Sequence, residues 1–230
     1  MTDTKTLLAL NGEIRGSRKD YSFIEDFLSQ TADGNNIPGQ EVPDIIAADG
    51  GALFLEKLSM LPDIIIGDLD SLSEKKCDYF RQHDVKIMQF PTEKDKTDGE
   101  LVMDFCQQNQ INFVLIVGAA GGRLDQQLGN ISLLEYALKL GIKAVIREPE
   151  MEIGLIDKGK KFIDNSGDLL SLIPLTEKVT GINLSGCKYT LEDEALFRYR
   201  NRGISNTIVQ KEAAVEIREG LLLYMKGCSF

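Results

Sequence analysis

The sequence is poor in the residues on which many catalytic and metal sites depend. Its 230 residues include no tryptophan, one histidine and four cysteines. The cysteines, at positions 77, 106, 187 and 228, form no C-x-x-C pair, which excludes the usual zinc-binding pattern. Scattered thiols favour a reducing compartment over a disulfide framework, so we expect a cytoplasmic protein. The one histidine, His83, is expected on the surface, and Ser-His-Asp or Cys-His catalysis would depend on it alone.

Positive charge is also in short supply. Acidic residues outnumber basic ones by 36 to 26, and the formal net charge at pH 7 is −10. No cluster of lysine and arginine stands against this field, so nucleic acid is not an expected partner. No apolar run reaches the roughly 18 residues of a membrane span, and the first residues lack the apolar stretch of a secretory signal. We therefore expect no membrane partner.

The first two-thirds of the chain alternate short apolar runs with amphipathic stretches. We expect strands at 6–10, 45–48, 64–66, 85–88, 113–117 and 144–146. We expect helices near 51–59, 73–83, 97–109 and 125–140, the last with an apolar stripe formed by Leu124, Leu128, Ile131, Leu134 and Leu138. This alternation predicts a mostly parallel sheet flanked by helices. The polar residues 29–43 are expected to form a loop.

The pattern changes around Arg147–Glu150. Beyond this point, short apolar runs are separated by turn dipeptides such as Lys158-Gly159 and Glu219-Gly220. Strands at this spacing are typical of a small antiparallel sandwich or barrel. The sequence therefore predicts two domains, an α/β domain over residues 1–148 and a smaller all-β domain over residues 149–230.

Aspartates follow four successive strands of the expected sheet. They are Asp49 after the strand at 45–48, Asp68 and Asp70 after 64–66, Asp95 and Asp98 after the strand near 85–90, and Asp125 after 113–117. Because the carboxyl ends of parallel strands share one edge, these side chains are expected on the rim where open α/β folds bind ligands. Any single one could be a turn or N-cap residue, and Thr97 with Glu100 fits a capping box. Their repetition along one rim favours a functional site.

A rim of carboxylates cannot face an anion unaided. At 4 Å, a carboxylate and a phosphate oxygen repel by about 4 kcal/mol at an effective dielectric of about 20. A divalent cation removes this repulsion, and Mg²⁺ suits carboxylate and phosphate oxygens. Gly121 and Gly122 would let backbone N–H groups approach phosphate at a helix start, while Arg123, Lys94 and Lys96 add positive charge. The rim therefore predicts chemistry on a Mg²⁺–nucleotide complex.

Two common nucleotide fingerprints are absent from the sequence. There is no G-x-x-x-x-G-K-[ST], since Gly159-Lys160 is followed by Lys161. No G-x-G-x-x-G follows the first expected strand, which continues into Asn11-Gly12-Glu13. A P-loop ATPase and an ordinary dinucleotide dehydrogenase are therefore not expected.

A series of short motifs runs in order along nearly the whole chain. In the first domain they are Asn11-Gly12, Ala48-Asp49-Gly50-Gly51-Ala52, Pro62-Asp63-x-x-x-Gly67-Asp68-Leu69-Asp70-Ser71, Lys94-Asp95-x-Thr97-Asp98, Gly118-x-x-Gly121-Gly122-Arg123-Leu124-Asp125 and Gly129-Asn130. In the second they are Ser171-Leu172-Ile173-Pro174-Leu175, Gly186-Cys187-Lys188-Tyr189-Thr190-Leu191 and Gly203-Ile204-Ser205-Asn206. No single motif is decisive, but the ordered set resembles the thiamine pyrophosphokinase (thiamine diphosphokinase) family.

The resemblance implies a catalytic, Rossmann-like α/β domain and a C-terminal β domain that contributes to a thiamine site. It implies a homodimer with active sites between the subunits. The reaction it implies is transfer of a pyrophosphoryl group from ATP to the hydroxyl of thiamine, which attacks the β-phosphorus and gives thiamine diphosphate and AMP.

The resemblance also implies roles for individual residues. Asp68, Asp70 and Asp98 would bind Mg²⁺ and, with Arg123, form the catalytic set. The nucleotide would be surrounded by Asp49, Gly50, Lys96, Thr97, Gly121, Gly122, Arg123 and Asp125, and thiamine would contact Ser205 and Asn206. Which aspartate, if any, accepts the hydroxyl proton stays open.

Two positions depart from the family pattern. Position 126 is Gln where many bacterial relatives have His, which weakens the role of this residue. Some relatives place a tryptophan against the vitamin, but this chain has none, so the stacking ring stays open between residues such as Tyr199 and Phe197.

Two other functions stay open. The segment Ile64–Leu72 also resembles the D-x-D motif of haloacid-dehalogenase phosphatases, whose first aspartate is a nucleophile, although position 72 is Leu instead of Thr or Val. The third possibility is a sensor that binds thiamine diphosphate or a nucleotide without turnover, although binding alone gains little from so many desolvated carboxylates. Orthophosphate without AMP would indicate the phosphatase, and binding without AMP the sensor.

Overall fold

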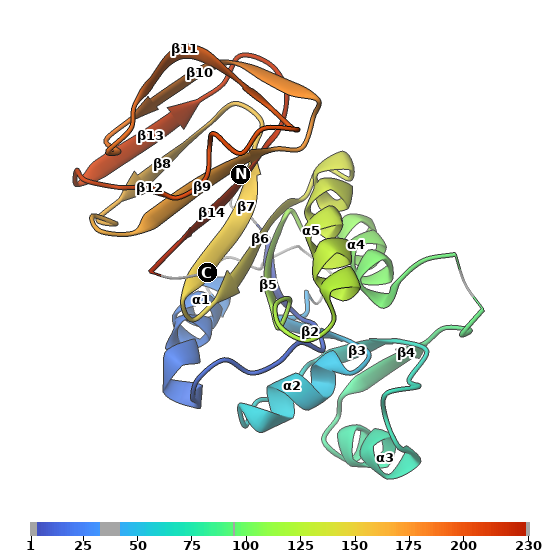
Figure 1. Ribbon diagram of the computed structural model, residues 1–230. Helices are drawn as coiled ribbons and strands as arrows, with labels where there is room; N and C mark the ends of the chain where they lie inside the picture. Colours follow the sequence, from blue (N-terminus) through green and yellow to red (C-terminus); the bar gives the residue numbers. More distant parts are fainter. Residues whose placement is uncertain (1–3, 33–41, 94, 229–230) are drawn as a thin grey trace. The chain divides into compact units, whose positions relative to one another are not determined.

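The computed structural model describes residues 4–32, 42–93 and 95–228 (Figure 1). Contacts within the chain divide it into two compact units, Met1–Pro149 and Glu150–Phe230. Each unit has its own hydrophobic core.

Unit 1 is built on a sheet in which every neighbouring pair of strands is parallel. The strands are β1 (Lys5–Ala9), β2 (Ile45–Ala48), β3 (Ile64–Gly67), β4 (Lys86–Gln89), β5 (Phe113–Val117) and β6 (Lys143–Glu148), in the order β6-β5-β1-β2-β3-β4. Leu7 and Leu8 point to opposite faces of β1, yet both are fully buried, as a strand covered on both sides requires. The predicted parallel sheet is confirmed.

Helices cover both faces of this sheet (Figure 1). They are the 3-10 helix η1 (Arg18–Tyr21), α1 (Ser22–Ala32), α2 (Gly51–Lys57), α3 (Glu74–Gln82), α4 (Asp98–Gln108) and α5 (Leu124–Lys139). Phe54 of α2 and Phe80 of α3 share one core cluster with Leu7, Ile65 and Leu115 of the strands. The helices α4 and α5 pack together, with α4 also against β2 and β3 and α5 against β6.

Two local predictions in unit 1 need correction. Residues 29–32, expected in a loop, are the last turn of α1, and the rest of that expected loop over 33–41 lies outside the described residues. The apolar stripe of α5 is buried at Leu134, but Leu124 is 69% exposed and Leu128 57% exposed. Neither leucine lines the pocket that the first turns of α5 border, and neither belongs to the buried core.

Unit 2 is a sandwich of two antiparallel sheets. One has the order β12-β9-β14-β7, from β7 (Met151–Ile156), β9 (Leu169–Pro174), β12 (Asn206–Thr207) and β14 (Leu222–Gly227). The other has the order β11-β10-β13-β8, from β8 (Gly159–Ile163), β10 (Lys178–Ser185), β11 (Leu191–Phe197) and β13 (Glu212–Glu216). Leu172 and Tyr224 of the first sheet share a core with Phe162 and Val215 of the second. The predicted small β-sandwich is confirmed.

Among the described residues, no helix combines the length and the apolar character needed to cross a membrane. The cytoplasmic location expected from the cysteines stays a prediction.

Candidate functional site

A pocket of about 540 Å³ opens at the carboxyl ends of the strands of unit 1. It is bordered by the segments that follow β1, β2, β3, β4 and β5, and by the first half of α5. Of the residues predicted for the site, those lining it are Asp49, Gly50, Asp70, Thr97, Asp98, Gly121 and Asp125. The structure thus brings together side chains from four separate strand ends.

Asp49 lies in the turn between β2 and α2, with a backbone φ of +43°. Its N–H donates a 3.0 Å hydrogen bond to the carbonyl of Ile66, which ties this turn to β3. The side chain is buried, and its Oδ1 atom has no hydrogen-bond partner within the described part of the chain. Burial, together with repulsion from Asp98 and Asp70, raises the pKa of Asp49. A buried, unpartnered carboxylate oxygen is costly unless a further group binds it.

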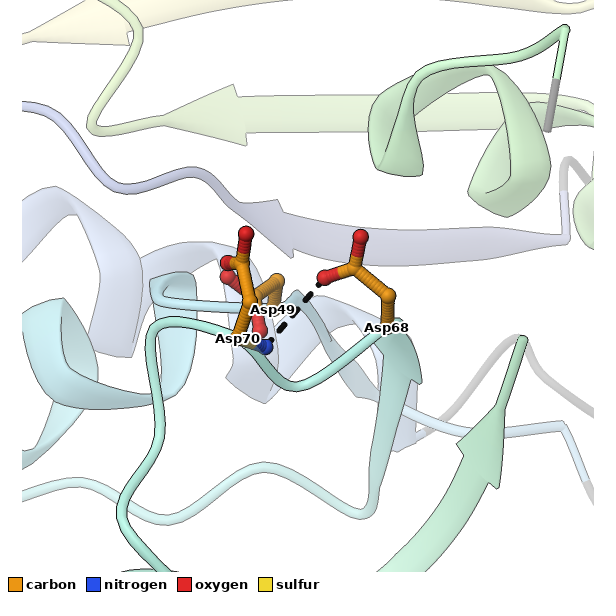
Figure 2. A group of neighbouring side chains, drawn as sticks. All are labelled: Asp49, Asp68 and Asp70. Carbon is orange, nitrogen blue, oxygen red and sulfur yellow. Dashed lines mark hydrogen bonds between the residues drawn. The ribbon is translucent and has the colours of Figure 1, made fainter. Parts of the chain in front are cut away.

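Three carboxylates meet at this point, and we call Asp49, Asp68 and Asp70 the acidic cluster (Figure 2). One oxygen of each lies within 4.8 Å of the others. The turn after β3 supplies two of them, because Leu69 adopts a left-handed φ of +67° and the N–H of Asp70 donates a 3.2 Å hydrogen bond to Oδ1 of Asp68. Three converging carboxylate oxygens, one an orphan, are a donor set that fits a hard divalent cation such as Mg²⁺.

Asp98 lies beside the acidic cluster, at the first residue of α4. The fit between them depends on Gly67, since a Cβ atom there would lie 2.9 Å from Cβ of Asp49 and 3.2 Å from Cγ of Asp98. The predicted metal ligands were Asp68, Asp70 and Asp98, whereas the acidic cluster contains Asp49 in place of Asp98. Asp49 was expected only in contact with the nucleotide.

The loop between β5 and α5 forms another wall of the pocket. Gly118, Gly121 and Gly122 adopt φ angles of +66°, +86° and +70°, which favour glycine. The loop leads into the N-terminus of α5, whose N-cap is Arg123. Backbone N–H groups at a helix start attract anions, so this wall is suited to phosphate.

Arg123 and Asp125 form an exposed ion pair at that helix start. The distance from Nε to Oδ1 is 3.1 Å and from Nη2 to Oδ2 is 2.5 Å. The guanidinium lowers the pKa of Asp125. Asp125 lines the pocket together with its neighbour Gln126, whereas Arg123 is not among the lining residues. The pair therefore keeps the guanidinium of Arg123 next to the loop.

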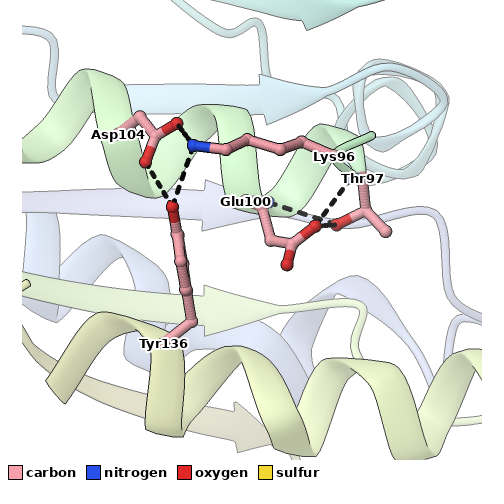
Figure 3. Close-up of polar contacts among 5 residues, drawn as sticks. All are labelled: Lys96, Thr97, Glu100, Asp104 and Tyr136. Carbon is pink, nitrogen blue, oxygen red and sulfur yellow. Dashed lines mark hydrogen bonds and ion pairs between the residues drawn. The ribbon is translucent and has the colours of Figure 1, made fainter. Parts of the chain in front are cut away.

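Lys96 and Thr97 precede α4 (Figure 3). Thr97 is the N-cap and forms a capping box with Glu100, as the sequence pattern predicted. Lys96 pairs with Asp104 at 2.5 Å and donates a 3.1 Å hydrogen bond to the hydroxyl of Tyr136, and these contacts raise the pKa of Lys96. Lys94, its expected companion, lies outside the described residues.

Ser205 and Asn206, predicted to contact thiamine, belong to unit 2. Asn206 lines a second cavity of about 550 Å³, together with Tyr189. The amide of Asn206 accepts from the N–H of Tyr189 at 3.1 Å and donates to its carbonyl at 2.7 Å. The N–H of Ser205 donates to Oγ of Ser171 at 3.0 Å. Much of the side chain of Asn206 is thus engaged in holding the backbone of Tyr189.

Sequence reasoning missed residues that support the site from behind. Asp104 and Tyr136 hold Lys96, and the buried Glu148 contacts the glycine-rich loop. Glu148 ends β6, so the rule that acidic residues at strand ends form the rim would have identified it. No local signal marks Asp104 or Tyr136, which lie 8 and 40 positions along the chain from Lys96.

Known proteins resemble this chain in sequence and in fold. The family model "Thiamin pyrophosphokinase, catalytic domain" matches residues 40–146, and "Thiamin pyrophosphokinase, vitamin B1 binding domain" matches residues 156–222. Thiamine pyrophosphokinase of Bacillus subtilis (strain 168) is 28% identical over 184 residues, which cover 79% of this chain and 86% of the relative. Thiamine pyrophosphokinase 1 of Arabidopsis thaliana is 25% identical over 203 residues, covering 77% of this chain and 75% of the relative.

Solved structures agree with the architecture. The crystal structure of thiamine pyrophosphokinase from Bacillus subtilis superimposes with a TM-score of 0.79 at 23% identity, and the match covers 98% of this chain and 100% of the other. Yeast thiamin pyrophosphokinase gives a TM-score of 0.75 at 21% identity, covering 99% of this chain and 87% of the other. At these identities the structures support the fold.

Proposed function

The chain belongs to the thiamin pyrophosphokinase family, and from this premise we propose that it transfers the pyrophosphoryl group of ATP to the hydroxyl of thiamine, releasing AMP. The observation that carries this proposal is the acidic cluster, whose carboxylate oxygens lie within 4.8 Å of one another on the rim of a pocket also lined by Gly121. In this proposal, the carboxylates that bind a metal and the backbone N–H groups that bind phosphate act on one ligand, the nucleotide.

The metal in this proposal is Mg²⁺. Asp68 and Asp70 are its ligands, with Asp49 as a third donor because its Oδ1 is buried and unpartnered, and with Asp98 alongside. When bound, Mg²⁺ would neutralise charge on the phosphate oxygens that the carboxylates would otherwise repel. The donor set is acidic and lacks nitrogen and sulfur, which fits this hard cation.

The nucleotide occupies the pocket of unit 1. Within the described residues, no acceptor is found for the N–H groups of Gly121 and Gly122, which leaves both for phosphate oxygens. Arg123 and Lys96 supply positive charge, and Asp49, Gly50, Thr97 and Asp125 border the remaining space. Phosphoryl-type transfer depends mainly on alignment and charge neutralisation, and these residues supply both.

The proposed step is one displacement at phosphorus. The oxygen of the thiamine hydroxyl forms a bond to the β-phosphorus while the bond from that phosphorus to the α,β-bridging oxygen breaks. AMP leaves with the bridging oxygen, and a carboxylate of the rim accepts the hydroxyl proton. Arg123 stabilises the negative charge of the group in transfer, as paired arginines do for phosphate.

Unit 2 contributes the thiamine site in this proposal. Asn206 and the ring of Tyr189 border the same cavity, and Tyr189 is 62% exposed. Ser205 follows Ile204, which is also exposed. A second copy of the chain would cover such apolar groups and the exposed Leu124 and Leu128 of α5, which supports a homodimer. Light scattering of the wild type and of Leu128→Glu tests the proposed homodimer, and a monomeric wild type would contradict it.

The direct test is to incubate the protein with ATP, Mg²⁺ and thiamine and to quantify AMP and thiamine diphosphate. Equal amounts of the two products are expected, together with their loss in Asp70→Asn. Orthophosphate without AMP would indicate a phosphatase instead. Thermal stabilisation by ligands without AMP, across several divalent metals, would indicate a sensor.

A further inference from the structure

Glu148 is a buried carboxylate that the proposed mechanism does not use. It ends β6 and is 1% exposed. In the part of the chain that the structure describes, it forms no ion pair, and burial raises its pKa. A carboxylate in such a place is tolerated only when hydrogen bonds satisfy its oxygens.

The hydrogen bonds of Glu148 come from two directions. Its Oε1 accepts the N–H groups of Ala119 at 2.8 Å and Ala120 at 3.2 Å. Its Oε2 accepts the hydroxyl of Tyr21 at 3.3 Å, and the oxygen of Tyr21 accepts the N–H of Arg15 at 3.0 Å. Tyr21 therefore holds one oxygen of the carboxylate while the other binds the loop between β5 and α5.

The two residues whose N–H groups bind Glu148 are also held through their carbonyl groups. The carbonyl of Ala119 accepts Nδ2 of Asn130 at 2.9 Å, and the carbonyl of Ala120 accepts the N–H of Glu13 at 3.3 Å. Ala119 lines the pocket, whereas Glu148 is not among the residues that line it. Glu148 thus acts on the pocket through the loop and not on a ligand directly.

We propose that Glu148 is a positioning residue, whose carboxylate holds the loop over residues 118–123 in the conformation that binds the phosphates of the nucleotide. This inference rests on the proposed function, because it takes the pocket to be the nucleotide site. The glycines of the loop have no side chains to fix their conformation, so its backbone needs an external anchor. The reach of the carboxylate, more than its charge, provides that anchor.

Two substitutions separate reach from charge. Glu148→Gln keeps the length and an oxygen that accepts both N–H groups, while Glu148→Asp keeps the charge but is shorter by one carbon–carbon bond. In the ligand-free protein, Glu148→Asp should speed amide hydrogen exchange at Ala119 and Ala120 by about tenfold or more, and Glu148→Gln by less than about threefold. The KM for MgATP should rise by about tenfold in the Asp variant, with the KM for thiamine unchanged.

Glu152 offers a matched control in unit 2, because its Oε1 accepts the hydroxyl of Tyr224 at 2.7 Å. Glu152→Asp disturbs a similar glutamate–tyrosine pair and should leave exchange at Ala119 and the KM for MgATP unchanged. The opposite order, with Gln defective and Asp intact, would overturn the proposal. So would a folded Asp variant with normal exchange and normal KM.

If Glu148→Asp fails to fold, Glu148→Gln decides, since fast exchange or a raised KM in that variant contradicts the proposal and normal values support it. Failure of the proposed function would instead appear in the wild type. There, MgATP would give no protection of the N–H groups of Gly121 and Gly122 and no AMP would form. The exchange rates at Ala119 in the ligand-free variants are measured without any nucleotide, so the two failures are distinguishable.

Discussion

The ammonium group of Lys96 donates a hydrogen bond to the hydroxyl of Tyr136, 3.1 Å away, and links the loop before α4 to α5 (Figure 3). That hydroxyl in turn donates to Oδ1 of Asp104 at 2.6 Å, while Lys96 pairs with Oδ2. Tyr136 lines the pocket and Lys96 does not. Lys96 is therefore tied to a residue of the pocket wall without lining the pocket itself, and the proposed role of its charge at the nucleotide can be tested.

Replacement of Lys96 by Gln tests this placement. We expect kcat/KM for MgATP to fall by about tenfold or more, because a hydrogen bond to a charged group contributes ~1.5–3 kcal/mol. Lys76→Gln is the matched control, since Lys76 pairs with Glu56 at the same 2.5 Å distance but on α3, outside the pocket lining. Steady-state kinetics that show equal losses in both variants would contradict a role of Lys96 at the nucleotide.

Addition and removal of Mg²⁺ should change the stability of the protein. At 100 times its Kd, an ion that binds only the folded state adds about 2.7 kcal/mol to the free energy of unfolding. Asp70→Asn should lose this gain, yet should be more stable than the wild type without metal, because repulsion on Asp49 is relieved. Asp78→Asn, which removes an exposed partner of Arg81, should keep the Mg²⁺ effect. Thermal unfolding with EDTA and with Mg²⁺ measures both the stability without metal and the gain on adding Mg²⁺. An unchanged Mg²⁺ response in Asp70→Asn would refute the metal assignment.

The parallel sheet and the acidic rim could be predicted because each has a local signature. Runs such as 113–117 are apolar on both faces, and Asp68 and Asp70 stand directly after one of them. The chemistry at a strand end therefore follows from its position in the chain. Asp49 was predicted on the same rim, but its close approach to Asp68 and Asp70 as a third donor could not be predicted, because it depends on the turn whose N–H binds Ile66 of the neighbouring strand.

Glu148 stands at a strand end like the aspartates of the rim, but its contacts could not be predicted from sequence, for the same physical reason. The hydrogen bond between Tyr21 and Glu148 joins residues 127 positions apart, and no periodic pattern encodes such a pair. The exposure of Leu124 and Leu128 was missed because the spacing of a stripe does not tell which of its turns pack against a core. Spacing predicts a face, and only tertiary structure decides what covers it.

Substitution of Gly129 should have opposite effects on the stability of α5 and on nucleotide binding in the pocket. It lies within the helix and lines the pocket, and a Cβ atom there would meet no heavy atom within 4 Å. Gly129→Ala should raise the free energy of unfolding by about 0.5–1 kcal/mol, since glycine weakens a helix interior. The added methyl group would enter the space proposed for the nucleotide, so we expect a higher Kd for MgATP by calorimetry, and a still higher one in Gly129→Leu. A more stable Gly129→Leu variant with normal affinity would place the nucleotide elsewhere.

The buried carboxylate of Glu148 should make stability depend on pH. Burial raises its pKa above the ordinary value of 4.5, while hydrogen bonds from Ala119, Ala120 and Tyr21 and the charge of Arg15 oppose this rise. A carboxyl group with a raised pKa binds its proton more tightly in the folded state. Its contribution to stability is therefore present below pH 4.5 and is lost as the pH rises through the folded-state pKa.

Glu148→Gln lacks this titration. We expect the free energy of unfolding of the variant, relative to the wild type, to increase as the pH rises from 4.5 through the folded-state pKa, and then to level off. Tyr21→Phe removes a hydrogen bond that lowers the pKa of Glu148, so its loss of stability should extend to higher pH than in the wild type. Urea unfolding at a series of pH values measures both effects, and parallel curves for Glu148→Gln and the wild type would show that the carboxyl group does not titrate differently in the folded state.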